Sequence, residues 1–209
     1  MKFTADQVWG CAAAAQRING GYFKEPEFAD DRVTILRNAN KSMVKGWLRD
    51  EDYSQITAAD TAEGIRARNH FKSYTLLAIA GRLNEFQETA MKLAAKEEFT
   101  GRDMYDFAVV SCLPAAMLRD QAKKELTTEI RFSTQLAAAV GDRIQGDIEV
   151  VKCYWNQNYG KWRVTARMGE SFVDFWASEE FKGTVSIKAK VKAQRGDNTT
   201  QLNYVKIIG

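Results

Sequence analysis

Residues 184–194 read Thr-Val-Ser-Ile-Lys-Ala-Lys-Val-Lys-Ala-Gln and give the clearest indication of the fold of the C-terminal third of the chain. Apolar side chains alternate here with lysines, which is typical of a β-strand with one buried face and one exposed face. Residues 161–168, Lys-Trp-Arg-Val-Thr-Ala-Arg-Met, alternate in the same way. Three further strand-like runs cover residues 143–156, 172–177 and 199–208, and segments rich in Gly, Asn, Asp and Ser separate them.

Five short strands within residues 141–209 predict a small closed barrel, because an open sheet of this size would leave exposed edges and a thin core. We expect a five-stranded, OB-fold-like β-barrel first and an SH3-like barrel second. Trp162 and Trp176 alternate with polar neighbours, which favours a place in the barrel core for both rings.

Residues 1–140 have helical spacing instead, and the period changes to that of a strand near Gly141. We therefore predict an α+β protein with an N-terminal all-helical domain over 1–140 and a barrel domain over 141–209. The segment from Thr4 to Gln7 fits a capping box at the start of the first helix. The helices are expected at about residues 5–18, 31–48, 57–83 and 85–97, followed by one from about 100 that is kinked at Pro114 and fades near 140.

The composition is that of a folded protein, with 45% hydrophobic and 27% charged residues among 209. No apolar run approaches the length of about 18 residues that a membrane helix needs, and the N-terminus leads directly into an amphipathic helix. Three scattered cysteines predict reduced thiols. These features indicate a cytoplasmic protein without membrane contact. The formal net charge of +3 lies wholly within residues 141–209, which hold 11 Lys and Arg against 8 Asp and Glu.

The residues that carry catalysis in other proteins are scarce. His70 is the only histidine and lies within a predicted helix, no pair of cysteines has zinc-ligand spacing, and no glycine-rich phosphate loop occurs. We therefore expect a protein that is not an enzyme, with no catalytic residue, no metal and no cofactor. A small enzyme that uses carboxylates and a divalent metal stays open as an alternative, since the chain holds 27 Asp and Glu.

Several short features of the last third occur in one order along the chain: Gly141-Asp142, Ile148–Val151, Tyr154, Trp155, Tyr159-Gly160, Phe175-Trp176, Lys182-Gly183, Val191-Lys192 and Thr200–Val205. In this order they resemble an OB-like domain at the ends of phage and plasmid replication-associated proteins that bind single-stranded nucleic acid. The layout of helices followed by such a barrel is similar to phage-encoded proteins. The resemblance implies a role in phage DNA replication, recombination or other nucleic-acid metabolism, in the host cytoplasm.

Basic residues interleave with aromatic ones where OB-folds bind their ligands, on strands two and three and on the first and fourth connections. We expect single-stranded nucleic acid as the ligand, single-stranded DNA in first place. A protein-interaction adaptor, docking a replication or transcription protein through residues 1–140, is the alternative. The predicted nucleic-acid-binding residues are Tyr154, Trp155, Asn158, Tyr159, Lys161, Arg163, Arg167, Phe175, Lys188, Lys190, Lys192 and Arg195. Phe172 replaces Phe175 in this set if the register of the third strand is the opposite one.

Overall fold

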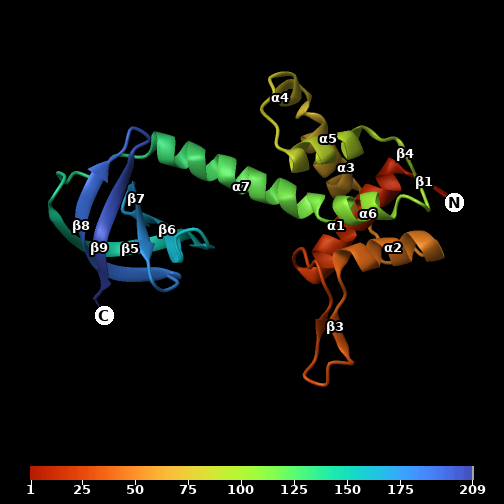
Figure 1. The fold of residues 1–209 in the computed structure, drawn as a ribbon, viewed down its shortest axis with the longest axis horizontal. Helices are drawn as coiled ribbons and strands as arrows, with labels where there is room; N and C mark the ends of the chain where they lie inside the picture. The colour runs from red at the N-terminus through yellow and green to blue at the C-terminus, as the bar shows by residue number, and fades with distance from the viewer. Residues whose placement is uncertain (209) are drawn as a thin grey trace. The chain divides into compact units, whose positions relative to one another are not determined.

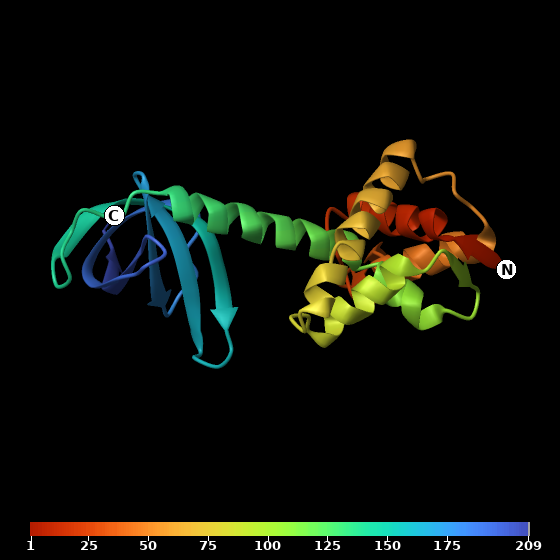
Figure 2. The ribbon, with the colours of Figure 1, turned by 90° about the horizontal axis from the view of Figure 1, so that it is seen from above.

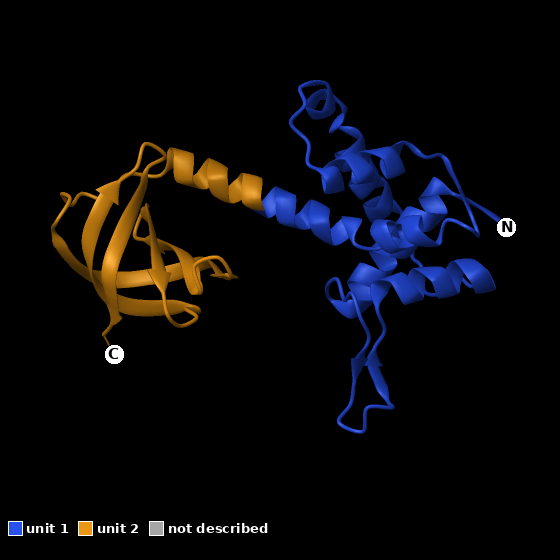
Figure 3. Cartoon of the chain, in the orientation of Figure 1, with its two compact units in different colours: residues 1–122 blue, residues 123–209 orange. Residues whose placement is uncertain are grey.

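The computed structural model describes residues 1–208 and divides into two compact units, the first ending at Ala122 and the second beginning at Lys123 (Figure 3). Helices fill most of the first unit and a β-barrel most of the second (Figure 1), so the protein is α+β as predicted. The division falls within a helix, ahead of the change of sequence period at Gly141.

The first unit contains helices and four very short strands. They are, in chain order, β1 (Lys2–Thr4), α1 (Ala5–Asn19), β2 (Glu27–Phe28), β3 (Ile35–Arg37), α2 (Asn40–Asp50), α3 (Ala58–Lys72), α4 (Thr75–Ile79), α5 (Glu85–Ala95), β4 (Glu98–Thr100), α6 (Met104–Val110) and α7 (Leu113–Phe132), whose last turns belong to the second unit.

Capping side chains fix the starts of three helices. The Thr4 hydroxyl accepts from the Gln7 backbone N–H while the Gln7 amide oxygen accepts from the Thr4 N–H, so the predicted capping box is confirmed. Thr57 and Asn84 cap α3 and α5 in the same reciprocal way. Because these caps satisfy backbone donors that no helical carbonyl can reach, they set the first residue of each helix.

Helix α1 packs closely against α3 through small residues. A Cβ atom added at Gly64 would lie 2.5 Å from the Trp9 carbonyl carbon and 2.7 Å from the Gly10 nitrogen, so only glycine fits. Trp9, fully buried, lies beside Phe71 with 6.4 Å between ring centroids. The close approach of the two backbones places both rings in the core of the first unit.

The prediction of one helix over residues 31–48 is wrong in its first half. Residues 27–37 form the β2–β3 hairpin instead, and α2 begins only at Asn40. Asp31 explains the difference, because its carboxylate accepts hydrogen bonds from the backbone N–H groups of Val33 and Thr34 at 2.9 and 2.8 Å. An aspartate that bonds its own following backbone stabilises a turn in competition with a helix.

The prediction of an all-helical N-terminal domain is also wrong, since β1 pairs antiparallel with β4 and β2 with β3. The helix predicted from Thr57 to Leu83 breaks after Lys72, where the Ser73 hydroxyl donates to the His70 carbonyl oxygen at 2.6 Å. The helical pattern expected to fade near Val140 ends at Phe132.

The second unit contains a closed barrel of the five predicted strands. They are β5 (Arg143–Asn156), β6 (Lys161–Met168), β7 (Ser171–Ala177), β8 (Thr184–Gln194) and β9 (Thr199–Ile207). Their order around the barrel is β5-β6-β7-β9-β8, and β7 and β9 form the parallel pair. Figure 2 shows the β5–β6 hairpin, in teal, reaching beyond the other strands. The expected closed barrel is therefore confirmed.

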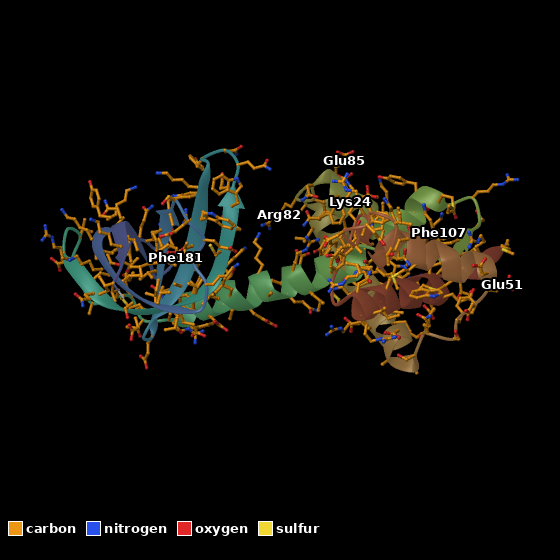
Figure 4. All side chains as sticks on the ribbon, turned by 90° about the horizontal axis from the view of Figure 1, so that it is seen from below. Lys24, Glu51, Arg82, Glu85, Phe107 and Phe181 are labelled. Atoms are coloured by element: carbon orange, nitrogen blue, oxygen red, sulfur yellow. The ribbon has the colours of Figure 1, made fainter. Side chains whose placement is uncertain are left out.

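The barrel core comes from one face of each strand. Ile148, Val164, Phe175, Ile187 and Leu202 are buried there, each from a different strand. Side chains outside the strands pack against this core, too. Phe181, which is labelled in Figure 4, follows β7 and packs edge-on against Phe175 at 5.1 Å between ring centroids, while Leu136 comes from the segment before β5.

Among residues 1–208, no helix combines the length and the apolar character needed to span a membrane.

Candidate nucleic-acid interface

The pairing register of β6 with β7 decides which side chains face outward. Val164 lies opposite Phe175 in the core, so the neighbouring residues Arg163 and Trp176 form an outward pair. Arg167 and Phe172 form a second outward pair four residues along each strand. Trp176 is therefore not in the core, contrary to the prediction, because it shares the outer face with Arg163.

The prediction that Phe175 binds nucleic acid is wrong, because this residue is 0% exposed. The register instead turns Phe172 outward, although this ring is itself buried. The guanidinium of Arg167 lies 5.3 Å from the centroid of the Phe172 ring, and it also pairs with Glu129 of α7 at 2.8 Å. At this end of the outer face, Arg167 therefore covers the Phe172 ring and is itself paired with Glu129.

Aromatic rings gather at the other end of this face, around the β5–β6 turn. The Tyr159 ring is 68% exposed and lies 5.0 Å from the Trp176 ring, centroid to centroid. The Arg163 guanidinium lies 5.0 Å from the same indole ring, and Tyr154 of β5 is the cross-strand neighbour of Arg163. We call Tyr154, Tyr159, Arg163 and Trp176 the stacking platform.

A buried carboxylate lies next to the stacking platform. Asp174 is only 2% exposed although it faces outward on β7, and its Oδ2 pairs with the guanidinium groups of Arg163 and, at 3.3 Å, Arg195. Its Oδ1 has no hydrogen-bond partner among the described residues. Burial raises the pKa of the Asp174 carboxyl, while the positive charges of both arginines act in the opposite direction. Two of the predicted phosphate-binding cations are therefore already paired.

Sequence reasoning missed Asp174, although the strands carried a signal for it. Outward arginines on one strand favour a carboxylate on the same face of the next strand, because opposite charges stabilise cross-strand neighbours. Asp174 alternates with Phe172 and Trp176, which would have placed all three on one face.

The remaining predicted residues lie on other surfaces. Trp155 pairs with Trp162 across β5 and β6, with 5.7 Å between ring centroids, on the face opposite to Tyr154. Trp162 is partly exposed here and is not one of the buried core residues, contrary to the prediction. Asn158 and Lys161 are exposed at the end of the β5–β6 hairpin.

The three lysines of β8, Lys188, Lys190 and Lys192, are exposed on the outer face of that strand. In the barrel order, β9 lies between β8 and the strand that carries Trp176. The lysines therefore belong to a different surface from the stacking platform. The structure brings together four predicted residues around the platform, namely Tyr154, Tyr159, Arg163 and Arg195.

Within residues 1–208, no group of three or more His, Cys, Asp or Glu side chains is arranged to hold a metal ion. The side chain of His70 makes contacts inside the first unit, with its Nε2 3.1 Å from the Tyr74 hydroxyl and 3.4 Å from an oxygen of Asp120. Comparisons with protein-family models, curated proteins and solved structures found no match to this chain.

Proposed function

We propose that the second unit is an OB-fold that binds single-stranded nucleic acid, single-stranded DNA in first place, without catalysing a reaction. Its setting would be the phage DNA replication or recombination that the sequence resemblance implies. Two features of the barrel support the OB assignment. The strands follow the order one-two-three-five-four, with a parallel pair of third and fifth strands, and five-stranded Greek-key barrels of this kind bind oligonucleotides on strands two and three.

The observation that carries the proposal is the position of the exposed Tyr159 and the Trp176 ring beside Arg163. They lie on strands two and three and the first connection, the part of an OB-fold that holds the ligand. Flat rings bind unpaired bases by stacking, which tolerates any base sequence because every base has a flat face. A duplex hides those faces, so the platform should prefer single strands.

The pairing of Arg163 and Arg195 with Asp174 gives these cations a second role. In the unbound protein the carboxylate fixes both guanidinium groups at the edge of the platform. A phosphate of the bound strand can then share them, since a guanidinium offers five N–H donors in a planar fork. The cations are held in place before binding, and less side-chain freedom is lost on binding.

Fluorescence anisotropy with a labelled oligothymidine and a matched duplex tests the proposal at about 50 and about 200 mM salt. Single strands should bind more tightly than duplex, and salt should weaken both complexes. Tyr159→Ala or Trp176→Ala should raise the Kd for the single strand about 5- to 150-fold, the loss expected for one stacked base. Tyr105→Ala is the matched control, because Tyr105 is similarly exposed, at 72%, but lies in the first unit. Absence of single-strand binding at low salt, or equal effects of Tyr159→Ala and Tyr105→Ala, would refute the proposal.

The β2–β3 hairpin favours a second candidate function, that of a protein-interaction adaptor. Its exposed apolar side chains are Phe28, Val33, Ile35 and Leu36. Clustered apolar groups on a surface are typical of protein-binding sites. If the protein is an adaptor, it should co-elute with a purified replication or transcription enzyme in size-exclusion chromatography. The double variant Val33→Asp with Leu36→Asp should abolish this co-elution. Raising the salt to about 200 mM should not abolish it, because the contact is apolar. Co-elution of this double variant would argue against the adaptor.

A further inference from the structure

The outer face of β5, β8 and β9 carries a second concentration of positive charge. A groove of about 680 Å³ is lined there by Arg143, Lys188, Lys190 and Lys206, together with Tyr204 and three uncharged residues. We call these four cations and Tyr204 the basic groove. No Asp or Glu side chain lines it. The ion pairs formed within the described part of the second unit all use other cations.

The strand register sets like charges against each other in the basic groove. Lys188 of β8 lies directly opposite Lys206 of β9, and Lys190 lies directly opposite Arg143 of β5. Like charges at directly opposite positions of neighbouring strands destabilise a sheet. An anion that binds between the two pairs would remove this repulsion, so the arrangement favours a ligand with several negative charges.

Tyr204 adds an exposed ring to the basic groove, and the backbone is bent to place it there. The three residues of β8 from Lys188 to Lys190 run opposite four residues of β9, from Lys206 to Asn203, and this extra residue makes a β-bulge. Tyr204 lies in this bulge with a φ of 52°, a backbone conformation that is uncommon for tyrosine, and its side chain is 77% exposed. Because Tyr204 lies among the four cations of the groove, a base of a bound strand can stack on its ring.

The spacing of the cations points to a chain of phosphates. Successive outward lysines of β8 lie two residues apart, about 7 Å along the strand, which is close to the interval between phosphates of an extended single strand. Lys192 continues the row beyond the groove. Its neighbour Ala193 lies opposite Gln201 of β9, and Gln201 lies opposite Asp174 of β7, beside the stacking platform. The row therefore leads from the basic groove toward the platform.

We propose that the basic groove binds the sugar-phosphate backbone of a single strand that leaves the stacking platform and continues around the barrel across β9. This inference rests on the proposed function. Strands that are long enough to reach both surfaces would then use stacking at one end and charge at the other, whereas short strands would occupy the platform alone.

The test compares a short labelled oligothymidine, about 8 nucleotides, with a long one of about 30, since one OB-fold covers about 4–16 nucleotides. The double variant Lys188→Ala with Lys206→Ala removes one of the opposed pairs. It should weaken binding of the long strand about tenfold at about 50 mM salt and flatten the slope of log K against log salt by about 1.4, or about 0.7 for each lost phosphate contact. Binding of the short strand should stay unchanged, and Tyr204→Ala should likewise weaken only the long strand.

The matched control is Lys123→Ala with Lys124→Ala, which removes two exposed positive charges of α7 outside the groove. Circular dichroism of each variant is the check that the barrel remains folded. If the groove variant binds the long strand like this control, or if it loses binding of vesicles with anionic lipid while both strands bind normally, the inference is overturned. The proposed function still stands in that case, provided the short strand binds and depends on Tyr159. If neither strand binds the unaltered protein, both proposals fail.

Discussion

Asp60 should make the stability of the first unit depend on acid. Its carboxylate lies at the start of α3, where it accepts from the Thr57 backbone N–H at 2.8 Å. Two hydrogen bonds of 2.8 and 2.9 Å join it to the guanidinium of Arg17 on α1. The bond from Arg17 is the main reason that the Asp60 pKa falls from 3.8 to about 2, and the bonds from Thr57 also lower it.

The size and sign of the effect follow from this pKa. A fall from 3.8 to about 2, at about 1.4 kcal/mol per pH unit, corresponds to about 2 kcal/mol of stability. Because the folded pKa is the lower one, this contribution is complete above the unfolded pKa and is lost as the pH falls from about 4 through about 2. Asp60→Asn should therefore lower the unfolding free energy at pH 7 by about 2 kcal/mol.

Urea unfolding followed by circular dichroism at pH 7, 4 and 2 measures this contribution. The difference between the unaltered protein and Asp60→Asn should shrink toward zero at the lowest pH. Asp50→Asn is the control, because Asp50 also pairs with a neighbouring arginine, Arg49, but does so on the exposed surface. A loss below about 0.5 kcal/mol for Asp60→Asn at pH 7, or a difference that does not depend on pH, would show that the Asp60 contacts do not join α1 to α3.

Three further variants test the core, the end of the barrel and the ligand face. Gly64→Ala should destabilise the first unit by about 3 kcal/mol or more in thermal unfolding, because the new methyl group meets the Trp9 backbone; an unchanged Tm would contradict the close crossing. Phe181→Ala should cost about 3–5 kcal/mol of barrel stability by loss of the contact with Phe175, measured by urea unfolding, whereas a loss under about 1 kcal/mol would mean that the ring does not belong to the core. Asp174→Asn should weaken single-strand binding about threefold in anisotropy at about 50 mM salt, because the carboxylate no longer holds Arg163 and Arg195 at the edge of the stacking platform; tighter binding would mean that its negative charge repels the ligand more than the fixed guanidinium groups help.

The strands of the barrel could be predicted because β6 and β8 have a regular apolar face and because turn residues separate all five runs. The strand register turns these faces inward, as in the opposed residues Val164 of β6 and Phe175 of β7. The strands of the first unit have two or three residues each, which is too short for any period to show. The β2–β3 hairpin depends on the side-chain bonds of Asp31, and apolar spacing does not reveal such a bond.

The candidate site was only partly predictable for a related reason. Arg163 and Arg167 alternate with apolar residues on β6, so their outward direction followed from the sequence. β7 has apolar residues on both faces, and its alternation could not distinguish Phe172 from Phe175 or place Trp176. Only the pairing of β7 with β6 settles which ring faces outward, and that pairing is a property of the assembled barrel.

The contacts between the barrel and the residues before it bear on how the protein can be divided for experiments. Glu129 pairs with Arg167, the Asn198 side chain donates to two carbonyl groups at the end of α7 and beyond, and Gln194 donates to two more in the segment that follows. A fragment that starts at β5 would lack Leu136 and Ala138, which pack against the barrel core, and would leave these polar side chains without partners. A fragment of residues 123–209 retains these contacts. Ligand binding can be measured on this fragment in the absence of the first unit.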